Sequence, residues 1–316
     1  MQPIHWYPGH MAKAKRLIDE NLKLVDVVVI LLDARAPMAT MNADIEKLAA
    51  NKAQLWVLNK ADMADPALTK AWLAYLQRDG RQACALDSRT NAAKTIAPRI
   101  RAVVQDKIDR AAAKGVRRGV RAMITGIPNV GKSTLINSLS GGAHTKTGDK
   151  PGVTKSKQWI RVDEYMEVMD TPGLLWPRQD DAQVSLHLAY IAAIRDGLVD
   201  SAELSQALLL EIAQRWPGAL KTRYKLDDLP PDDTGEALLA AICRKRGCLL
   251  PGGVLDVERG AMMVMEDFRS KRLGAITLEV PPQKNSPPQH ENPPQQQSQP
   301  QEIPSQSEKG DSHDTH

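Results

Sequence analysis

The segment 126–133 constrains this chain more than any other, because its sequence, Gly-Ile-Pro-Asn-Val-Gly-Lys-Ser, fits the pattern Gly-x-x-x-x-Gly-Lys-Ser/Thr. The apolar run 120–125 before it predicts a strand, and residues 134–140 after it predict the start of a helix. In that context, backbone N–H groups wrap a phosphate and the helix N-terminus adds its dipole. Lys132 reaches the β- and γ-phosphates, and the Ser133 hydroxyl binds Mg²⁺. The segment predicts a nucleoside triphosphate site without distinguishing ATP from GTP.

Strand-like and helix-like segments alternate along the first part of the chain, which predicts an α/β fold with an open, mostly parallel sheet. The strands are expected to be near-continuously apolar, because parallel strands are covered on both faces. From about residue 182 the pattern changes to helical spacing without strand runs, which predicts a small all-α domain. The expected strands are 25–32, 54–58, 81–86 and 120–125, with a hairpin at 158–169. The expected later helices are 184–196, 201–216, 234–246 and 257–273, and a long earlier one is 96–113.

The length of 316 residues suggests about two domains at roughly 150 residues each. We expect a nucleotide-binding domain at 1–178, a helical domain at 179–280 and a disordered tail at 281–316, which is rich in Pro, Gln and Ser. No apolar run approaches the roughly 20 residues that span a bilayer, and the N-terminus lacks a signal-peptide pattern. We therefore expect a cytoplasmic protein with no membrane contact. The three cysteines, of which Cys243 and Cys248 are close enough to pair, are better explained as reduced thiols.

The charge balance suits a polyanionic partner without proving one. The formal net charge is +4, and the tail after residue 280 carries more acidic than basic residues, so the body is more basic than the whole. Phosphate contacts need such cations, although any one cluster is more often a solvated face. Basic residues gather at 114–118 with Arg121, at 221–225, at 244–246 and at 269–272.

A second motif follows the predicted strand 54–58, where Asn-Lys-Ala-Asp at 59–62 fits the guanine-reading pattern Asn-Lys-x-Asp. A carboxylate at Asp62 accepts both the ring N–H and the exocyclic amine of guanine, a pairing that adenine cannot offer. Asn59 bridges the base edge and the phosphate loop, and the Lys60 stem covers the ring face. Ligands bind at the carboxyl ends of strands in such sheets, so this motif beside the phosphate loop makes the nucleotide GTP.

Further polar turns at strand ends complete the predicted site. A backbone N–H of the pair Asp87 and Ser88 meets the guanine oxygen. Asp170, Ser133 and Thr154 are the expected Mg²⁺ ligands, with Asp170 acting through water. The residues expected to contact the nucleotide are Asn59, Lys60, Asp62, Asp87, Ser88, Asn129, Val130, Gly131, Lys132, Ser133, Thr134 and Gly173.

The order of these motifs is rotated, because the guanine reader precedes the phosphate loop, whereas most GTPases begin with the loop. The segment 6–14, Trp-Tyr-Pro-Gly-His-Met-Ala-Lys-Ala, stands in front, and Asp-Ala-Arg-Ala-Pro at 33–37 follows the first strand. In these features residues 1–280 resemble the circularly permuted bacterial GTPases of the YlqF/RbgA type. The resemblance implies a permuted P-loop GTPase domain followed by the helical domain. It also implies GTP hydrolysis on the maturing large ribosomal subunit, binding through rRNA and release after hydrolysis.

The usual catalytic group is absent, because Leu174 occupies the place of a water-orienting glutamine. The simpler interpretation is that the protein is a slow GTP-dependent switch without a dedicated catalytic side chain. The resemblance implicates His10, with Lys132, in hydrolysis, since an imidazole over the γ-phosphate could position water. Asn129 resembles the asparagine of K⁺-activated GTPases, in which a monovalent cation offsets developing charge; the alternative is an asparagine that caps its own turn.

Three functions compete at this stage. The first is a GTP-hydrolysing assembly factor of the large ribosomal subunit, acting as a monomer and stimulated by the subunit. The second is a GTP-gated RNA-binding scaffold in which hydrolysis is incidental. The third, an RNA-modifying or transport-linked GTPase, is disfavoured because no second catalytic cluster or membrane segment occurs in the sequence.

Overall fold

The structure is a computed structural model that describes residues 16, 18–90, 92–142, 158–171, 181–194, 200–230 and 234–283. By its internal contacts the chain divides into two units, Met1–Pro281 and Pro282–His316. The first unit contains all the helices and strands of the described residues. None of the described helices is both long and apolar enough to cross a membrane.

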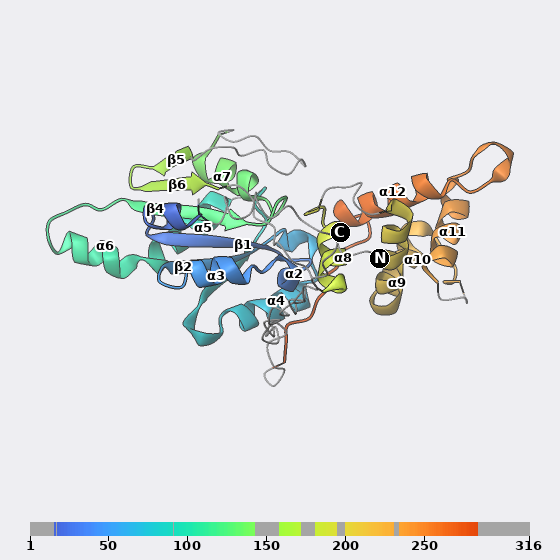
Figure 1. The fold of residues 1–316 in the computed structure, drawn as a ribbon, viewed down its shortest axis with the longest axis horizontal. Coiled ribbons are helices and arrows are strands. Elements are labelled where there is room, and N and C mark those ends of the chain that lie inside the picture. Colours follow the sequence, from blue (N-terminus) through green and yellow to red (C-terminus); the bar gives the residue numbers. More distant parts are fainter. Residues whose placement is uncertain are drawn as a thin grey trace, which may run out of the picture. The chain divides into compact units, whose positions relative to one another are not determined.

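A six-stranded sheet forms the centre of the first part of the chain (Figure 1). Its spatial order is β3-β2-β1-β4-β6-β5, with every neighbouring pair parallel except the edge pair β5 and β6. This confirms the predicted open, mostly parallel sheet. The strands are β1 (Val27–Asp33), β2 (Ala53–Asn59), β3 (Gln82–Leu86), β4 (Val120–Gly126), β5 (Gln158–Asp163) and β6 (Met166–Asp170).

The central strand β1 explains why the sheet is covered on both faces. All seven of its side chains are buried. Successive side chains of a strand point to opposite faces, so its apolar residues alternate between two hydrophobic clusters. Val27, Val29 and Leu31 enter one cluster. Val28, Ile30 and Leu32 enter the other. Burial of each such aliphatic side chain contributes about 1.5–3 kcal/mol, which makes β1 the main hydrophobic anchor of the sheet.

Helices follow most strands, and one of them differs from the expectation. The predicted single helix at 96–113 is wrong, because α5 (Ala92–Val103) and α6 (Gln105–Ala112) are separated at Val104, whose ψ is 16°. Val104 is buried, whereas α6 buries none of its side chains. No glycine marks this break, so periodicity alone does not reveal it. The remaining helices of this part are α2 (Pro37–Thr40), α3 (Ala43–Leu48), α4 (Pro66–Leu76) and α7 (Lys132–Ser140).

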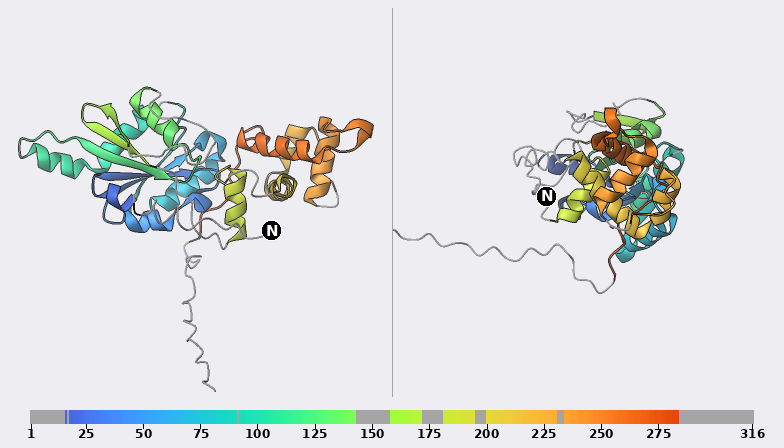
Figure 2. Two further views of the ribbon diagram at one scale, coloured as in Figure 1. Left: turned by 45° about the horizontal axis from the view of Figure 1, so that its top comes forward. Right: turned by 90° about the vertical axis from the view of Figure 1, so that its right-hand side faces the viewer.

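The later part of the described chain is helical, as the sequence predicts. Its helices α9 to α12, yellow to orange in Figure 2, pack against one another. Side chains of Asp181, Asp200, Thr234 and Asp256 cap α8, α9, α11 and α12. The sequence analysis missed α10, which starts with Pro217 directly after α9. The helices are α8 (Ala182–Tyr190), α9 (Ser201–Arg215), α10 (Pro217–Tyr224), α11 (Gly235–Arg246) and α12 (Val257–Arg269).

An extended segment at 275–280, the C-terminal strap, returns from α12 to the sheet-containing part. Ile276 N donates to Met63 O at 3.1 Å, and Leu278 N donates to Arg35 O at 2.7 Å. The Glu279 carboxylate accepts hydrogen bonds from Met38 N at 2.5 Å and Ala39 N at 3.0 Å, at the start of α2. These bonds satisfy helix N–H groups that have no local cap, since Ala36 offers none. The strap was not predicted.

Candidate nucleotide site at the carboxyl ends of the strands

The phosphate loop lies between the end of β4 and the start of α7, as its sequence predicts. Its two glycines are required by geometry. A Cβ atom on Gly126 would lie 2.7 Å from Leu31 O of the neighbouring strand. Gly131 has φ +103°, and a Cβ atom there would lie 2.2 Å from Asn59 Nδ2. The loop is therefore folded tightly against both β1 and the end of β2.

Lys132 is the first residue of α7, and its side chain is 8% exposed. Its ammonium group donates to Ile127 O at 2.7 Å and to Gly126 O at 3.2 Å, so it folds back over the loop. Burial lowers the pKa of Lys132 to about 8; the charge of Asp170 opposes this shift and that of Lys60 adds to it. A buried cation held over a loop of backbone amides is suited to an anionic phosphate. The donor set therefore fits a nucleotide phosphate.

The predicted guanine reader is joined directly to the phosphate loop. Asn59 Nδ2 donates to Val130 O at 2.7 Å, and Lys60 Nζ donates to Asn129 O at 2.7 Å. Lys60 has φ +57° and Asn129 has φ +58°, so both residues of this contact adopt the left-handed conformation. Two motifs about 70 residues apart in sequence thus form one rigid assembly.

The carboxylate predicted to pair with guanine lies beside an arginine that the sequence analysis did not single out. Arg89 Nη2 donates to Asp62 Oδ2 at 2.5 Å, and Arg89 Nε donates to Asp87 Oδ1 at 3.1 Å. Partial burial raises the pKa of Asp87, but hydrogen bonds from Arg89 outweigh it and leave the pKa below its usual value. Asp62 Oδ1 is buried and accepts no hydrogen bond from the described residues. An unsatisfied buried acceptor at this position fits the N–H groups of a guanine edge.

Ser88 lies beside Asn59 rather than presenting its amide to the base. Both Ser88 N, at 3.1 Å, and Ser88 Oγ, at 2.6 Å, donate to Asn59 Oδ1. Because Asn59 Nδ2 also donates to Val130 O, both the nitrogen and the oxygen of this side-chain amide are hydrogen-bonded. Ser88 therefore positions the reader, a role for which the sequence offered no separate signal.

Asp33 ties the reader to the end of β1. This carboxylate is fully buried and accepts hydrogen bonds from Arg35 Nε at 2.9 Å and Nη2 at 2.8 Å. Lys60 Nζ lies 3.0 Å from Asp33 Oδ2. Burial raises the pKa of Asp33, but the charges and hydrogen bonds of Arg35 and Lys60 reverse the effect and hold it far below the usual value. Arg35 also stacks over the Phe268 ring of α12 at 5.5 Å, so the network reaches the helical part.

The predicted metal ligands lie at neighbouring strand and helix ends. Ser133 follows Lys132 in the first turn of α7, and Asp170, 2% exposed, ends β6 opposite Ile124 of β4. Thr171 Oγ1 donates to Ile124 O at 2.7 Å, which fixes this strand end. A hydroxyl and a carboxylate together with phosphate oxygens form the hard oxygen set that Mg²⁺ prefers. The described residues contain no cluster of three or more His, Cys, Asp or Glu side chains placed to hold a metal by themselves.

Asn129 makes a contact that the sequence did not predict. Its Nδ2 donates to Ala192 O at 2.7 Å, just after α8. The phosphate loop thus touches the first of the later helices. Among the other predicted site residues, Val130 is buried and Thr134 is partly buried in α7. His10, Thr154, Gly173 and Leu174 lie outside the described residues.

Comparisons with known proteins identify relatives of this chain. A family model described as "50S ribosome-binding GTPase" matches residues 121–215. Ribosome biogenesis GTPase A of Bacillus cereus is 44% identical over 282 residues, which are 89% of this chain and 95% of the relative. Ribosome biogenesis GTPase A of Thermotoga maritima is 30% identical over 276 residues, which are 87% of this chain and 94% of the relative.

A solved structure shares the fold. The crystal structure of GNP-bound YlqF from T. maritima superposes with a TM-score of 0.57 at 25% identity and covers 85% of this chain and 98% of that one. The agreement spans both the sheet and the later helices, so it includes the rotated motif order that the sequence shows. A guanine reader joined to a phosphate loop in that order, matched by relatives over nearly their whole length, places this chain in the ribosome biogenesis GTPase A family.

Proposed function

We propose that this protein is a cytoplasmic GTPase that assists assembly of the large ribosomal subunit, binds its rRNA and leaves after hydrolysis. The observation that carries the proposal is the direct bond between the two nucleotide motifs, Asn59 Nδ2 to Val130 O at 2.7 Å. Because the predicted guanine reader is fixed to the phosphate loop, a ligand that occupies both must carry a guanine base and a phosphate chain. The names of the relatives support the ribosomal role.

Each predicted residue has a role in this proposal. Asp62 accepts the guanine N–H groups, while Asn59, Lys60, Asp87 and Ser88 shape and support the base site. The loop from Asn129 to Gly131, with Lys132, Ser133 and Thr134, binds the phosphates, and Gly173 donates to the γ-phosphate. Mg²⁺, held by Ser133, Thr154 and Asp170, would neutralise charge on the β- and γ-phosphates.

The nucleotide state reaches the helical part by two routes in this proposal. Gly173 lies nine positions before the first residue of α8 in the sequence, and Asn129 bonds to Ala192 just after the same helix. A γ-phosphate bound by Gly173 and the phosphate loop therefore acts on the chain at both ends of α8. Since α8 contacts α2, α9 and α12, its shift alters the surface that the helices present to RNA.

Sedimentation with ribosomal subunits tests the proposed function. The protein should pellet with large-subunit precursors in the presence of a non-hydrolysable GTP analogue and stay in the supernatant with GDP. The physical reason is that a nucleotide changes binding to the subunit only if the GTP-bound and GDP-bound states differ in their affinity for it. Small ribosomal subunits serve as the control. Equal pelleting with both nucleotides, or with both subunits, would contradict the proposal.

Hydrolysis needs a replacement for the glutamine that Leu174 displaces. We propose that His10 positions the attacking water and that Asn129 helps to hold K⁺ beside the phosphates. His10→Ala should retain GTP binding but lose at least about tenfold of the subunit-stimulated rate. Exchange of K⁺ for Na⁺ at equal ionic strength should slow GTP hydrolysis by the native protein.

Single-turnover hydrolysis measures both effects. An unchanged rate for His10→Ala would show that His10 does not take part in catalysis. Equal rates in the two salts would show that hydrolysis does not depend on K⁺. If the subunit fails to stimulate the native protein while binding remains GTP-dependent, hydrolysis is incidental. The GTP-gated RNA-binding scaffold would then be the better description.

A further inference from the structure

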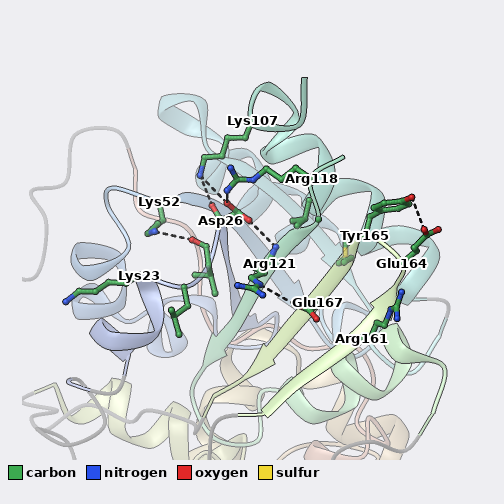
Figure 3. Close-up of a pocket in the computed structure, with 15 residues that line it drawn as sticks. Lys23, Asp26, Lys52, Lys107, Arg118, Arg121, Arg161, Glu164, Tyr165 and Glu167 are labelled. Atoms are coloured by element: carbon green, nitrogen blue, oxygen red, sulfur yellow. Dashed lines mark hydrogen bonds and ion pairs between the residues drawn. The ribbon is translucent and has the colours of Figure 1, made fainter. Parts of the chain in front are cut away.

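A pocket of about 720 Å³ lies at the end of the sheet opposite the phosphate loop (Figure 3). Its walls include Val25 and Asp26 just before β1, Gly119 and Val120 at the start of β4, and Met166 at the start of β6. The phosphate loop follows the other end of β4. At about 3.3 Å per residue, this seven-residue strand separates the two sites by roughly 20 Å. The pocket is thus distinct from the nucleotide site.

The pocket is lined by twice as many cationic as anionic side chains. Its carboxylates are Asp26, Glu164 and Glu167. Its cations are Lys23, Lys52, Lys107, Arg118, Arg121 and Arg161. They come from segments far apart in sequence, and the fold collects them at one edge of the sheet.

Asp26 holds two of these cations at the rim of the pocket. Its Oδ1 lies 2.6 Å from Arg118 Nη2 and 3.9 Å from Lys107 Nζ, and its Oδ2 accepts from Arg121 N at 3.2 Å. The side chains of Arg118 and Lys107 nevertheless remain 49% and 43% exposed. One carboxylate therefore orders two cations without covering them, and leaves their outer N–H groups accessible to a second anion.

Three further cations form no ion pair within the described part of the chain. Lys52 Nζ donates to Val25 O at 3.1 Å, and Arg161 Nε donates to Asp163 O at 3.1 Å, so backbone carbonyls rather than carboxylates orient them. Lys23 and Arg161 are exposed. In Figure 3 Lys23 and Arg161 stand on opposite sides of the pocket, with Arg118 and Arg121 between them. The positive charge is spread along the pocket rather than focused on one point.

We propose that this pocket binds the phosphodiester backbone of RNA, as a second contact separate from the helical part. A spread of cations fits a row of phosphates better than it fits a single phosphate group, which needs convergent donors. A nucleic-acid strand carries a charge at every residue, which an acidic protein segment rarely matches. The proposal rests on the proposed function for the presence of RNA. It adds that this contact lies away from GTP.

The test uses the full-length protein and a short fluorescent RNA hairpin, with anisotropy measured between 50 and 200 mM salt. The double variant Lys23→Gln/Arg161→Gln should lose about tenfold in affinity at low salt and show a salt slope shallower by about 1.5. Lys70→Gln/Lys94→Gln removes the same charge from exposed positions on α4 and α5 outside the pocket, and should bind like the native protein. GTP affinity should be unchanged in both variants.

The outcomes separate this inference from the proposed function. If the native protein pellets with ribosomal subunits but the two double variants bind RNA equally, only the pocket proposal fails. If the pocket variant loses affinity for polyglutamate more than for RNA, the partner is an acidic protein and the proposal is overturned. A native protein that binds no RNA at any salt concentration also overturns it.

Discussion

Gly131→Ala is expected to weaken GTP binding by at least about 100-fold, the largest single-residue effect in the nucleotide site. The new methyl group would meet Asn59 Nδ2 at 2.2 Å, and φ +103° is a conformation that alanine rarely adopts. Relief of this clash must move either the phosphate loop or the guanine reader, so base and phosphate contacts are lost together. Titration of a fluorescent GTP analogue measures the change.

Gly141→Ala provides the matched control. Gly141 ends α7 with φ +68°, and a Cβ atom there meets nothing within 4 Å. It shares the backbone strain of Gly131 but not the clash, so it should cost about 1 kcal/mol of stability and leave GTP affinity unchanged. Similar affinities for the two variants would show that the contact between loop and reader does not govern binding.

The contribution of the His187 charge to the free energy of unfolding is expected to fall by about 3 kcal/mol between pH 6.5 and pH 9. His187 is buried between two carboxylates, with Nδ1 2.8 Å from Glu279 Oε1 of the strap and Nε2 3.1 Å from Glu211 Oε1 of α9. Burial lowers the pKa of His187, but both glutamates more than offset this and raise it to about 9. Because the folded pKa is raised, the stabilisation is complete below pH 6.5 and is lost as the pH rises through 9.

Urea unfolding at several pH values tests this expectation. His187→Gln keeps a polar group but no charge, so the difference in the free energy of unfolding between the native protein and this variant isolates the His187 contribution. Lys132, whose lowered pKa acts in the opposite direction over this range, is present in both proteins and cancels. Glu236→Gln, on the exposed face of α11, is a control for charge removal and should retain the native profile. A difference between the native protein and His187→Gln that stays constant from pH 6.5 to 9 would mean that His187 is neutral in the folded protein.

The sheet and its motifs were predictable because they depend on local sequence. Apolar runs such as that of β1 specify buried strands, and parallel strands bring their carboxyl ends to one edge whatever their order in the chain. That rule alone predicted that Asn59 lies beside the phosphate loop, where its Nδ2 donates to Val130 O. The same reasoning anticipated a helical later part, since its apolar spacing changes period near residue 182.

The remaining features depend on contacts between distant segments, which no local pattern encodes. Glu279 caps α2, which lies about 240 residues earlier in the chain. Asn129 of the phosphate loop donates a hydrogen bond to Ala192 O. The role of Arg89 as the link between Asp62 and Asp87 likewise arises from three-dimensional proximity. Such polar contacts resemble ordinary surface residues in the sequence, so they emerge only once the fold is known.

The strap makes one early helix depend on a segment that is synthesised much later. All six strands have been made by Asp170, yet the helix after the first of them obtains its N-terminal hydrogen bonds only from Glu279. The same strap fixes Arg35 O through Leu278 N, next to the buried Asp33 network. A nascent chain therefore cannot complete the N-terminal hydrogen bonds of α2 until Glu279 has been made and has folded back onto this helix.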